Sequence, residues 1–360
     1  MNFKQYGRPA VIALAAALAL SSCAANEGAP ADTASALAGT INAGGASSQQ
    51  AAQEAWIAAF QTKNPDVTIN YDPSGSGAGR EAFIAGGIDF AGSDSFLNDE
   101  ELAGTFAACA PGASAVDLPV YISPIAVIFN VDGVTDLNVD ATTLARIFKG
   151  DIDTWNDPAL VALNQGTTLP ATAITAVHRS DDSGTTKNFS DYLGKTAPDV
   201  WTEEAADPFP YQSGEGAQGT SGVVDAVTNG VGTIGYADAS RAGDLGVAKL
   251  KVGDEFVDYS AEAAAAVVTG SPLVEGREAN DLAFELNRTT TNPAEYPLVL
   301  VSYAIVCTEY ADPARAELVK AYVGYLASAE GQAEAEKSAG AAPMSTELQD
   351  QVAAVLESVK

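Results

Sequence analysis

The middle of the 360-residue chain contains the turn Arg179-Ser180-Asp181-Asp182-Ser183-Gly184-Thr185. Apolar alternation predicts a strand over 174–178 just before it, and helical periodicity predicts a helix over 185–193 just after it. The turn combines an arginine, hydroxyl groups, a glycine and the unpaired N–H groups of a helix start. Because a helix start carries partial positive charge, this combination favours the binding of an anion.

Three further turns have the same composition and also lie at the start of a predicted helix. They are 42–48 (NAGGASS), 74–79 (SGSGAG) and 214–222 (GEGAQGTSG), which lead into helices predicted over 48–63, 77–85 and 223–228. Serine and glycine also serve as ordinary helix caps, so one such turn is weak evidence. Four of them in one chain favour a shared anion site.

Strands and helices alternate along the whole chain, which predicts α/β layers. Strands are expected over 67–71, 89–92, 174–178, 233–236 and 297–306, and the segment 118–130 is β-rich with Pro119 and Pro124 expected to break it. A helix capped by Asp140 is expected over 141–148, and the chain is helical from Pro313 onward.

The N-terminus resembles the signal segment of a bacterial lipoprotein. Basic Lys4 and Arg8 precede the apolar run 11–20, which ends in Leu20-Ser21-Ser22-Cys23. A ten-residue helix is only about 15 Å long, too short to span a bilayer. We therefore expect residues 1–22 to be a signal peptide, Cys23 to carry a palmitate-type lipid anchor on the extracytoplasmic face of the cell membrane, and 23–36 to be a flexible tether. An ordinary secretory signal with a chance cysteine is the alternative.

Two cysteines remain, Cys109 and Cys307, and in an exported chain they suggest one disulfide; two buried free thiols are the alternative. Residues 37–360 are too many for one compact core and fit two lobes. A Cys109–Cys307 bond would return the C-terminal segment to the N-terminal lobe.

The net charge of −29 disfavours nucleic acid and anionic lipid as partners, but screening leaves a buried anion site possible.

Several motifs together resemble the periplasmic phosphate-binding proteins of the phosphate ABC importer. They are Tyr71-Asp72-Pro73-Ser74-Gly75-Ser76-Gly77, then Asp89-Phe90-Ala91-Gly92-Ser93-Asp94, then Arg179 to Thr185, with support from the 43–48 turn, 148–150 and 154–158. The resemblance implies an α/β, two-lobed type II periplasmic-binding-protein fold with a hinge and a ligand cleft between the lobes. Lobe one is expected over 37–122 plus 299–360, and lobe two over 123–298.

The resemblance also implies a phosphate site made of Ser47, Ser48, Ser76, Asp94, Arg179, Ser183, Gly184 and Thr185. Asp94 would accept a proton of the ligand in a hydrogen bond, and Asp181 would steady Arg179, whose planar guanidinium suits two phosphate oxygens. A plain Arg179–Asp181 ion pair and a surface role for Asp94 are the alternatives. No cofactor is implied. The partner implied is the membrane permease of an ABC importer, and we expect a monomer.

The sequence disfavours an enzyme. A phosphatase would need a metal cluster or an activated nucleophile, whereas His178 is the only histidine and no cluster has metal-ligand spacing. The 214–219 glycines match the spacing of a dinucleotide fingerprint, but Pro208 and Pro210 exclude the strand that it requires. A receptor for sulfate or molybdate, or a phosphate sensor, remains the alternative to a phosphate receptor.

Overall fold

The computed structural model describes residues 37–360, so the expected signal peptide, Cys23 and the tether 23–36 lie outside the described residues. Strands and helices alternate along the described part, and the fold is mixed α/β as predicted. Within 37–360 no helix has both the length and the apolar character that crossing a bilayer requires.

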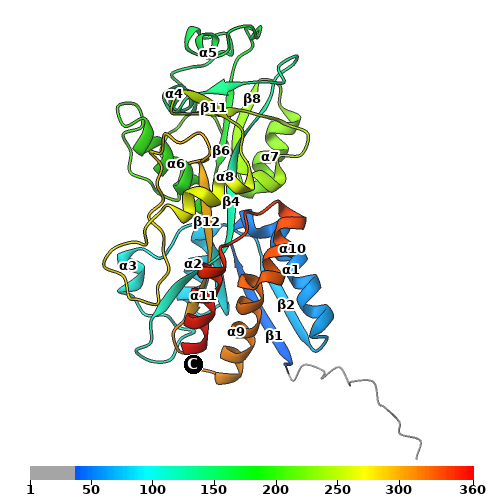
Figure 1. Ribbon diagram of the computed structural model, residues 1–360, viewed down its shortest axis with the longest axis vertical. Coiled ribbons are helices and arrows are strands. Elements are labelled where there is room, and N and C mark those ends of the chain that lie inside the picture. Colours follow the sequence, from blue (N-terminus) through cyan, green and yellow to red (C-terminus); the bar gives the residue numbers. More distant parts are fainter. Residues whose placement is uncertain (1–36) are drawn as a thin grey trace, which may run out of the picture. The chain divides into compact units, whose positions relative to one another are not determined.

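One nine-stranded sheet runs through the described residues (Figure 1). Its order is β2 (Val67–Asp72), β1 (Gly39–Gly45), β3 (Phe90–Ser93), β12 (Val299–Cys307), β4 (Ala115–Asn130), β8 (Thr233–Asp238), β6 (Thr175–Arg179) and β7 (Glu215–Ala217), with β9 (Gly246–Val247) added to β4. A small second sheet contains β11 (Glu255–Val257), β10 (Lys249–Val252) and β5 (Asn138–Val139).

The large sheet has two halves that meet at β4. In the first half β2, β1 and β3 are parallel and β12 is antiparallel to β3 and β4. In the second half β8, β6 and β7 are parallel, and β8 is antiparallel to β4. The carboxyl ends of parallel strands are where open α/β sheets bind ligands, so each half offers one such edge.

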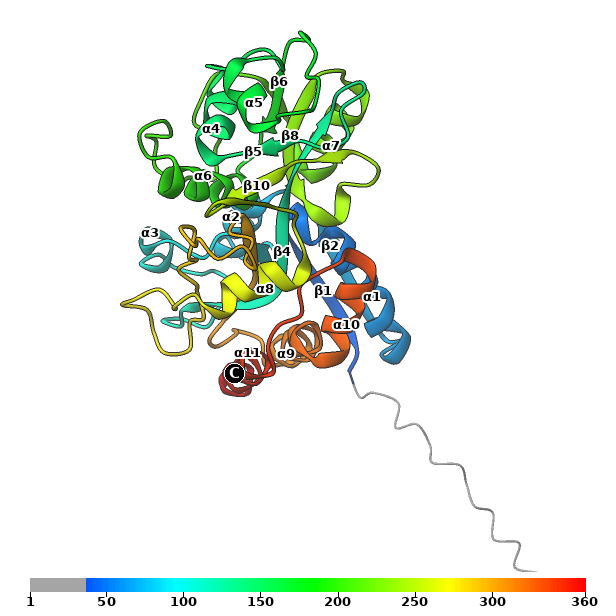
Figure 2. The same cartoon turned by 45° about the horizontal axis from the view of Figure 1, so that its top comes forward.

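Figures 1 and 2 show separate helices beside each half, with N-terminal and C-terminal elements together on the first. Beside the first half lie α1 (Gln50–Lys63), α2 (Ser76–Ile84), α3 (Asp99–Leu102), α9 (Pro313–Ala327), α10 (Ala329–Ala339) and α11 (Thr346–Ser358). Beside the second lie α4 (Ala141–Lys149), α5 (Pro158–Leu163), α6 (Gly184–Thr196) and α7 (Gly219–Asn229). Helix α8 (Ala261–Thr269) contacts β4 and β12, and Ser47–Gln49 and Ala239–Arg241 are short 3-10 helices.

Strand β4 corrects one prediction, because it continues through both prolines that were expected to break it. Pro119 pairs with Tyr303 beside a register shift in β12, and Pro124 lies where β4 changes its partner from β12 to β8. A proline lacks the N–H that a regular ladder needs, so it is tolerated at irregular positions such as these. The strand therefore bends at its prolines without ending, and it joins the two halves.

Buried aromatic residues hold helices against each half. Trp56 of α1 is fully buried and donates from Nε1 to the carbonyl of Gly331 at 2.6 Å, which ties α1 to α10. In the second half, Phe189 of α6 stacks on Tyr236 of β8 with 4.2 Å between the ring centroids. The start of α6 is thus held at the edge of the sheet by packing beneath it.

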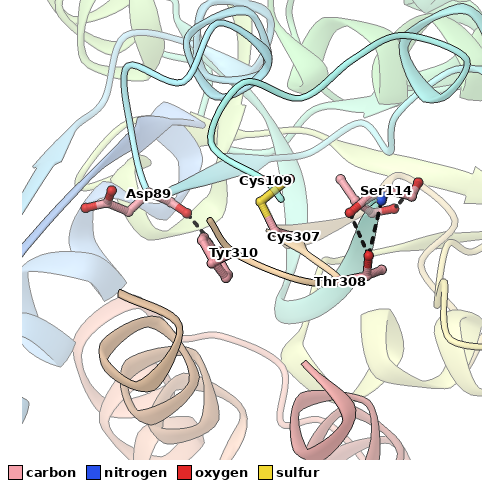
Figure 3. The surroundings of a disulfide bond; sticks show 7 residues. Asp89, Cys109, Ser114, Cys307, Thr308 and Tyr310 are labelled. Carbon is pink, nitrogen blue, oxygen red and sulfur yellow. Dashed lines mark hydrogen bonds between the residues drawn. A yellow bond between two sulfur atoms is a disulfide. The ribbon is translucent and has the colours of Figure 1, made fainter. Parts of the chain in front are cut away.

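A disulfide joins Cys109, in the loop before β4, to Cys307, the last residue of β12 (Figure 3). Nearby, Tyr310 donates to the carbonyl of Asp89 at 2.8 Å, and Thr308 donates to the carbonyl of Ser114 at 3.0 Å. These bonds attach the segment after β12 to segments that precede β4. The C-terminal part of the chain is therefore fixed to the first half of the sheet.

The disulfide closes a loop of large size, since its cysteines lie 198 positions apart. In the chain-entropy model such a bond stabilises the native state by about 4–5 kcal/mol. We expect the double substitution Cys109→Ser, Cys307→Ser to lower the free energy of unfolding by up to that amount in urea titrations. Alkylation of native, unreduced protein should modify neither cysteine, and two alkylatable thiols would contradict the bond.

Candidate functional site

The Ser/Gly/Thr turns lie at the carboxyl ends of strands in both halves of the sheet, and these two edges face each other. The first turn follows β1 and contains Ser47 and Ser48, both buried. The Ser47 hydroxyl lies 2.9 Å from that of Thr220 and accepts the Thr220 N–H at 3.0 Å, while the Ser48 hydroxyl donates to Asp94 at 2.6 Å. Because Thr220 lies in the first turn of α7, its bonds with Ser47 already link the two halves.

Asp94 follows β3 directly and accepts hydrogen bonds from three hydroxyl groups. Ser48 and Ser302 donate to Oδ1 at 2.6 and 2.5 Å, and Thr185 donates to Oδ2 at 2.8 Å. Its backbone N–H donates to the hydroxyl of Ser76, the first residue of α2, at 3.1 Å. Burial raises the pKa of Asp94, although the three hydroxyls and the charge of Arg179 act in the opposite direction.

Arg179 is the last residue of β6, and only 3% of it is exposed. Its Nε donates to Asp181 Oδ1 at 2.8 Å, and its Nη2 donates to Oδ2, so that the pair is bidentate. Asp181 also accepts the N–H of Gly219 at 2.9 Å. Burial alone would raise the pKa of Asp181, but its hydrogen bonds with Arg179 and the charge of Arg179 outweigh burial and lower it. Two of the five guanidinium N–H groups are thus used to fix the orientation of the others.

Helix α6 begins with the remaining predicted residues. Ser183 is its N-cap and accepts the N–H of Thr186 at 3.2 Å, while its own N–H donates to the carbonyl of Asp207 at 3.0 Å. The hydroxyl of Ser183 retains its donor, and the start of this 13-residue helix supplies partial positive charge.

The structure thus brings Ser47, Ser48, Ser76, Asp94 and Thr185 together by direct hydrogen bonds between themselves or with Thr220. Burial raises the pKa of Asp94, and the positive charge of Arg179 opposes that rise, so these two groups interact electrostatically. Gly184 is close enough that a Cβ atom there would lie 2.7 Å from Ser76 Oγ and 2.8 Å from Asp94 Cβ. All eight predicted residues are buried at one junction between the halves.

Sequence reasoning missed several polar residues at this junction. Ser302 lies in the fully buried strand β12, and its hydroxyl accepts from Gln49 at 2.7 Å, which directs its own O–H to Asp94. Asn188 donates to the carbonyl of Asp94 at 2.8 Å. Thr220 belongs to the 214–222 turn, which had been singled out without any residue being assigned. The signal for Ser302 was a polar residue inside an otherwise apolar strand.

Residues 37–360 contain no group of three or more histidine, cysteine or acidic side chains arranged to hold a metal ion. His178 stacks on Phe209 with ring centroids 3.9 Å apart, and its Nδ1 lies 2.9 Å from the carbonyl of Arg179. His178 is therefore a packed side chain beside the turn that begins at Arg179.

Taken together, a sheet in two halves and a buried polar junction between their carboxyl edges have the architecture of a two-lobed solute-binding protein with the type II fold. The PBP superfamily domain matches residues 30–330. The chain belongs to this superfamily and, within it, to the PstS family of phosphate-binding proteins, which are binding proteins and not enzymes.

Curated relatives show the family. Phosphate-binding protein PstS 3 of Mycobacterium leprae is 38% identical over 79% of this chain and 78% of its own length. PstS 2 of Mycobacterium tuberculosis is 32% identical over the full length of both chains.

Solved structures agree on the fold. A periplasmic phosphate-binding protein called PfluDING, solved with phosphate, gives a TM-score of 0.70 at 22% identity over 88% of this chain and 93% of that one. A putative phosphate ABC transporter substrate-binding protein from Clostridium perfringens gives a TM-score of 0.60 at 20% identity over 85% of this chain and all of that one.

The close approach at Gly184 generates a test. A Cβ there would meet Ser76 Oγ, Asp94 Cβ and the backbone N of Ser95 at 2.7–2.8 Å, all across the junction. Phosphate is the ligand named for the relatives. We expect Gly184→Ala to weaken the binding of phosphate by tenfold or more, because the carboxyl edges of the two halves of the sheet can no longer come into contact. Calorimetric titration measures this.

Gly194→Ala is the matched control, since it lies in the same helix and its Cβ would make only an ordinary contact with Trp201 at 3.9 Å. It should bind phosphate as the parent does. Equal affinity of both variants and the parent would show that the junction does not close on the ligand.

Proposed function

We propose that the chain binds hydrogen phosphate at the junction and delivers it to the membrane permease of an ABC importer. Lobe one would contain 37–122 plus 299–360 and lobe two 123–298, with the hinge where the chain crosses between them, within β4 and at the start of β12. Pro124 and Ile125 lie at the point where β4 changes partners, which supports a hinge there. Closure of the lobes would enclose the ion, and the permease would recognise the closed form.

The observation that carries the proposal is a buried acid, Asp94, and a buried arginine, Arg179, near the facing starts of α2 and α6. Arg179 and the N–H and hydroxyl groups at the starts of α2 and α6 are donors, as a phosphate oxygen requires. Hydrogen bonds to charged groups contribute roughly 1.5–3 kcal/mol each. Asp94 is the acceptor in this set, and an acceptor suits only a ligand that still carries a proton. Ser47, Ser48, Ser76, Asp94, Arg179, Ser183, Gly184 and Thr185 are the proposed phosphate contacts, supported by Asp181.

Calorimetry of the purified soluble domain, residues 37–360, against phosphate, sulfate and molybdate tests the ligand. Phosphate should bind with the highest affinity. Equal or tighter binding of sulfate would make the chain a receptor for another oxyanion, and binding of none of the three would exclude all of these functions.

Asp94 makes a prediction about selectivity. At neutral pH phosphate keeps a proton that can donate to the carboxylate, whereas sulfate is fully ionised and would face it with lone pairs only. An unpaired charge in a buried site discriminates more strongly than shape, and the two ions are nearly the same size. We expect Asp94→Asn, which replaces a pure acceptor by a group that can also donate, to narrow the ratio of phosphate to sulfate affinity. Competition binding on parent and variant measures this ratio. An unchanged ratio would remove Asp94 from selectivity while leaving the ligand in place.

We further propose that acylated Cys23 anchors the protein, as a monomer, to the extracytoplasmic face of the membrane. The support is the sequence Leu20-Ser21-Ser22-Cys23 after an apolar run. More than one acyl chain is needed for stable attachment, which a lipoprotein cysteine supplies.

Cys23→Ala should therefore leave the precursor unprocessed or shift the protein from the membrane fraction to the soluble fraction. Fractionation of cells that express parent and variant, with immunoblotting, measures both effects. A variant that migrates and partitions like the parent would rule out the anchor.

A further inference from the structure

Asp207 lies in the loop between α6 and β7 and contacts segments of the other half of the sheet. Its Oδ2 accepts from Arg80 Nη2 at 2.5 Å, and its Oδ1 accepts from the Ser95 hydroxyl at 2.7 Å. Its side chain is 10% exposed and that of Arg80 is 7% exposed. Arg80 is on α2, and Ser95 follows Asp94, so both contacts cross from proposed lobe two to proposed lobe one.

The residues that Asp207 contacts are neighbours of the proposed phosphate ligands. Arg80 lies one helical turn after Ser76 on α2, and Ser95 is adjacent to Asp94. The backbone carbonyl of Asp207 accepts the N–H of Ser183 at 3.0 Å. One residue therefore connects the binding turn of lobe two to the two binding segments of lobe one, without being placed among the ligands.

We propose that Asp207 is a latch that holds the lobes closed and so contributes to phosphate affinity without contacting the ion. This inference rests on the proposed function and on the two proposed lobes. The latch forms only on closure, because its partners Arg80 and Ser95 move with lobe one while Asp207 moves with lobe two.

Arg80 is prepared for this contact within lobe one. Its Nε donates to Glu101 at 2.8 Å and its Nη1 donates to Ser93 at 3.2 Å. A guanidinium already held in place loses little side-chain entropy when it gains one more partner. Burial alone would raise the pKa of Asp207, but Arg80 and Ser95 outweigh burial and lower it, so the closed environment favours the carboxylate.

When the charge of Asp207 is removed, the latch predicts weaker phosphate binding, whereas simple electrostatic repulsion predicts tighter binding. An acid near an anion site repels the ligand, so its neutralisation would tighten phosphate binding. If Asp207 is a latch, its neutralisation breaks a buried inter-lobe ion pair and weakens binding. The sign of the change therefore separates the two roles.

The test measures phosphate affinity by calorimetry and phosphate release by stopped flow for the parent, Asp207→Asn and Glu101→Gln. We expect Asp207→Asn to weaken affinity by about tenfold, which is about 1.4 kcal/mol, mainly through faster release. Glu101→Gln removes the same kind of charge from the same guanidinium, but within lobe one. The loss of binding free energy in Glu101→Gln should be less than a third of the loss in Asp207→Asn.

Unchanged or tighter binding by Asp207→Asn, or equal effects of both variants, would overturn the latch. Thermal unfolding without phosphate checks that Asp207→Asn folds. If it does not fold, Ser95→Ala takes its place, since it removes only the second inter-lobe bond, and a latch predicts that binding weakens by about threefold. A parent that does not bind phosphate would refute the proposed function instead, because the latch test starts from a parent that does.

Discussion

The carboxylate of Asp94 accepts hydrogen bonds from hydroxyls on three segments that are remote from one another in the chain: Ser48 after β1, Ser302 in β12 and Thr185 in α6. The first two partners belong to the half of the sheet that contains Asp94, and the third belongs to the other half. The three bonds exist together only when the halves are in contact. One acid therefore ties four segments of the chain together at the junction.

An acid that is buried without a cation in contact is costly, and the structure compensates with directed donors. Burial raises the pKa of Asp94, while the hydroxyls and the more distant charge of Arg179 oppose the rise. Gln49 donates to Ser302 and thereby turns the serine O–H toward the carboxylate. Asp94 thus acts as an acceptor because of the hydroxyls that donate to it and also because of Gln49, which orients one of those hydroxyls.

Local features of the junction could be predicted from the sequence, and long-range ones could not. The turns after the strands were recognisable from their serine, glycine and threonine content, because helix starts need those residues locally. Ser302 and Thr220 were missed because their roles depend on partners 208 and 173 positions away, at Asp94 and Ser47. The continuity of β4 through Pro119 and Pro124 was missed for a similar reason. A proline is tolerated in a strand where the pairing with the neighbouring strand is irregular. For β4 the neighbouring strands are β12 and β8, which are remote in the sequence.

Several acids near the junction of this chain, whose net charge is −29 at pH 7, are paired with arginines. Asp181 is paired with Arg179, and Glu101 and Asp207 share Arg80. Exposed acids beyond about 10 Å are screened by salt. Within residues 37–360, Asp94 and the neighbouring buried Asp238 lie in no ion pair and accept hydrogen bonds from hydroxyls instead. In the proposed site the carboxylate of Asp94 would face the ligand, where it would disfavour a fully ionised oxyanion and accept a hydrogen bond from a protonated one.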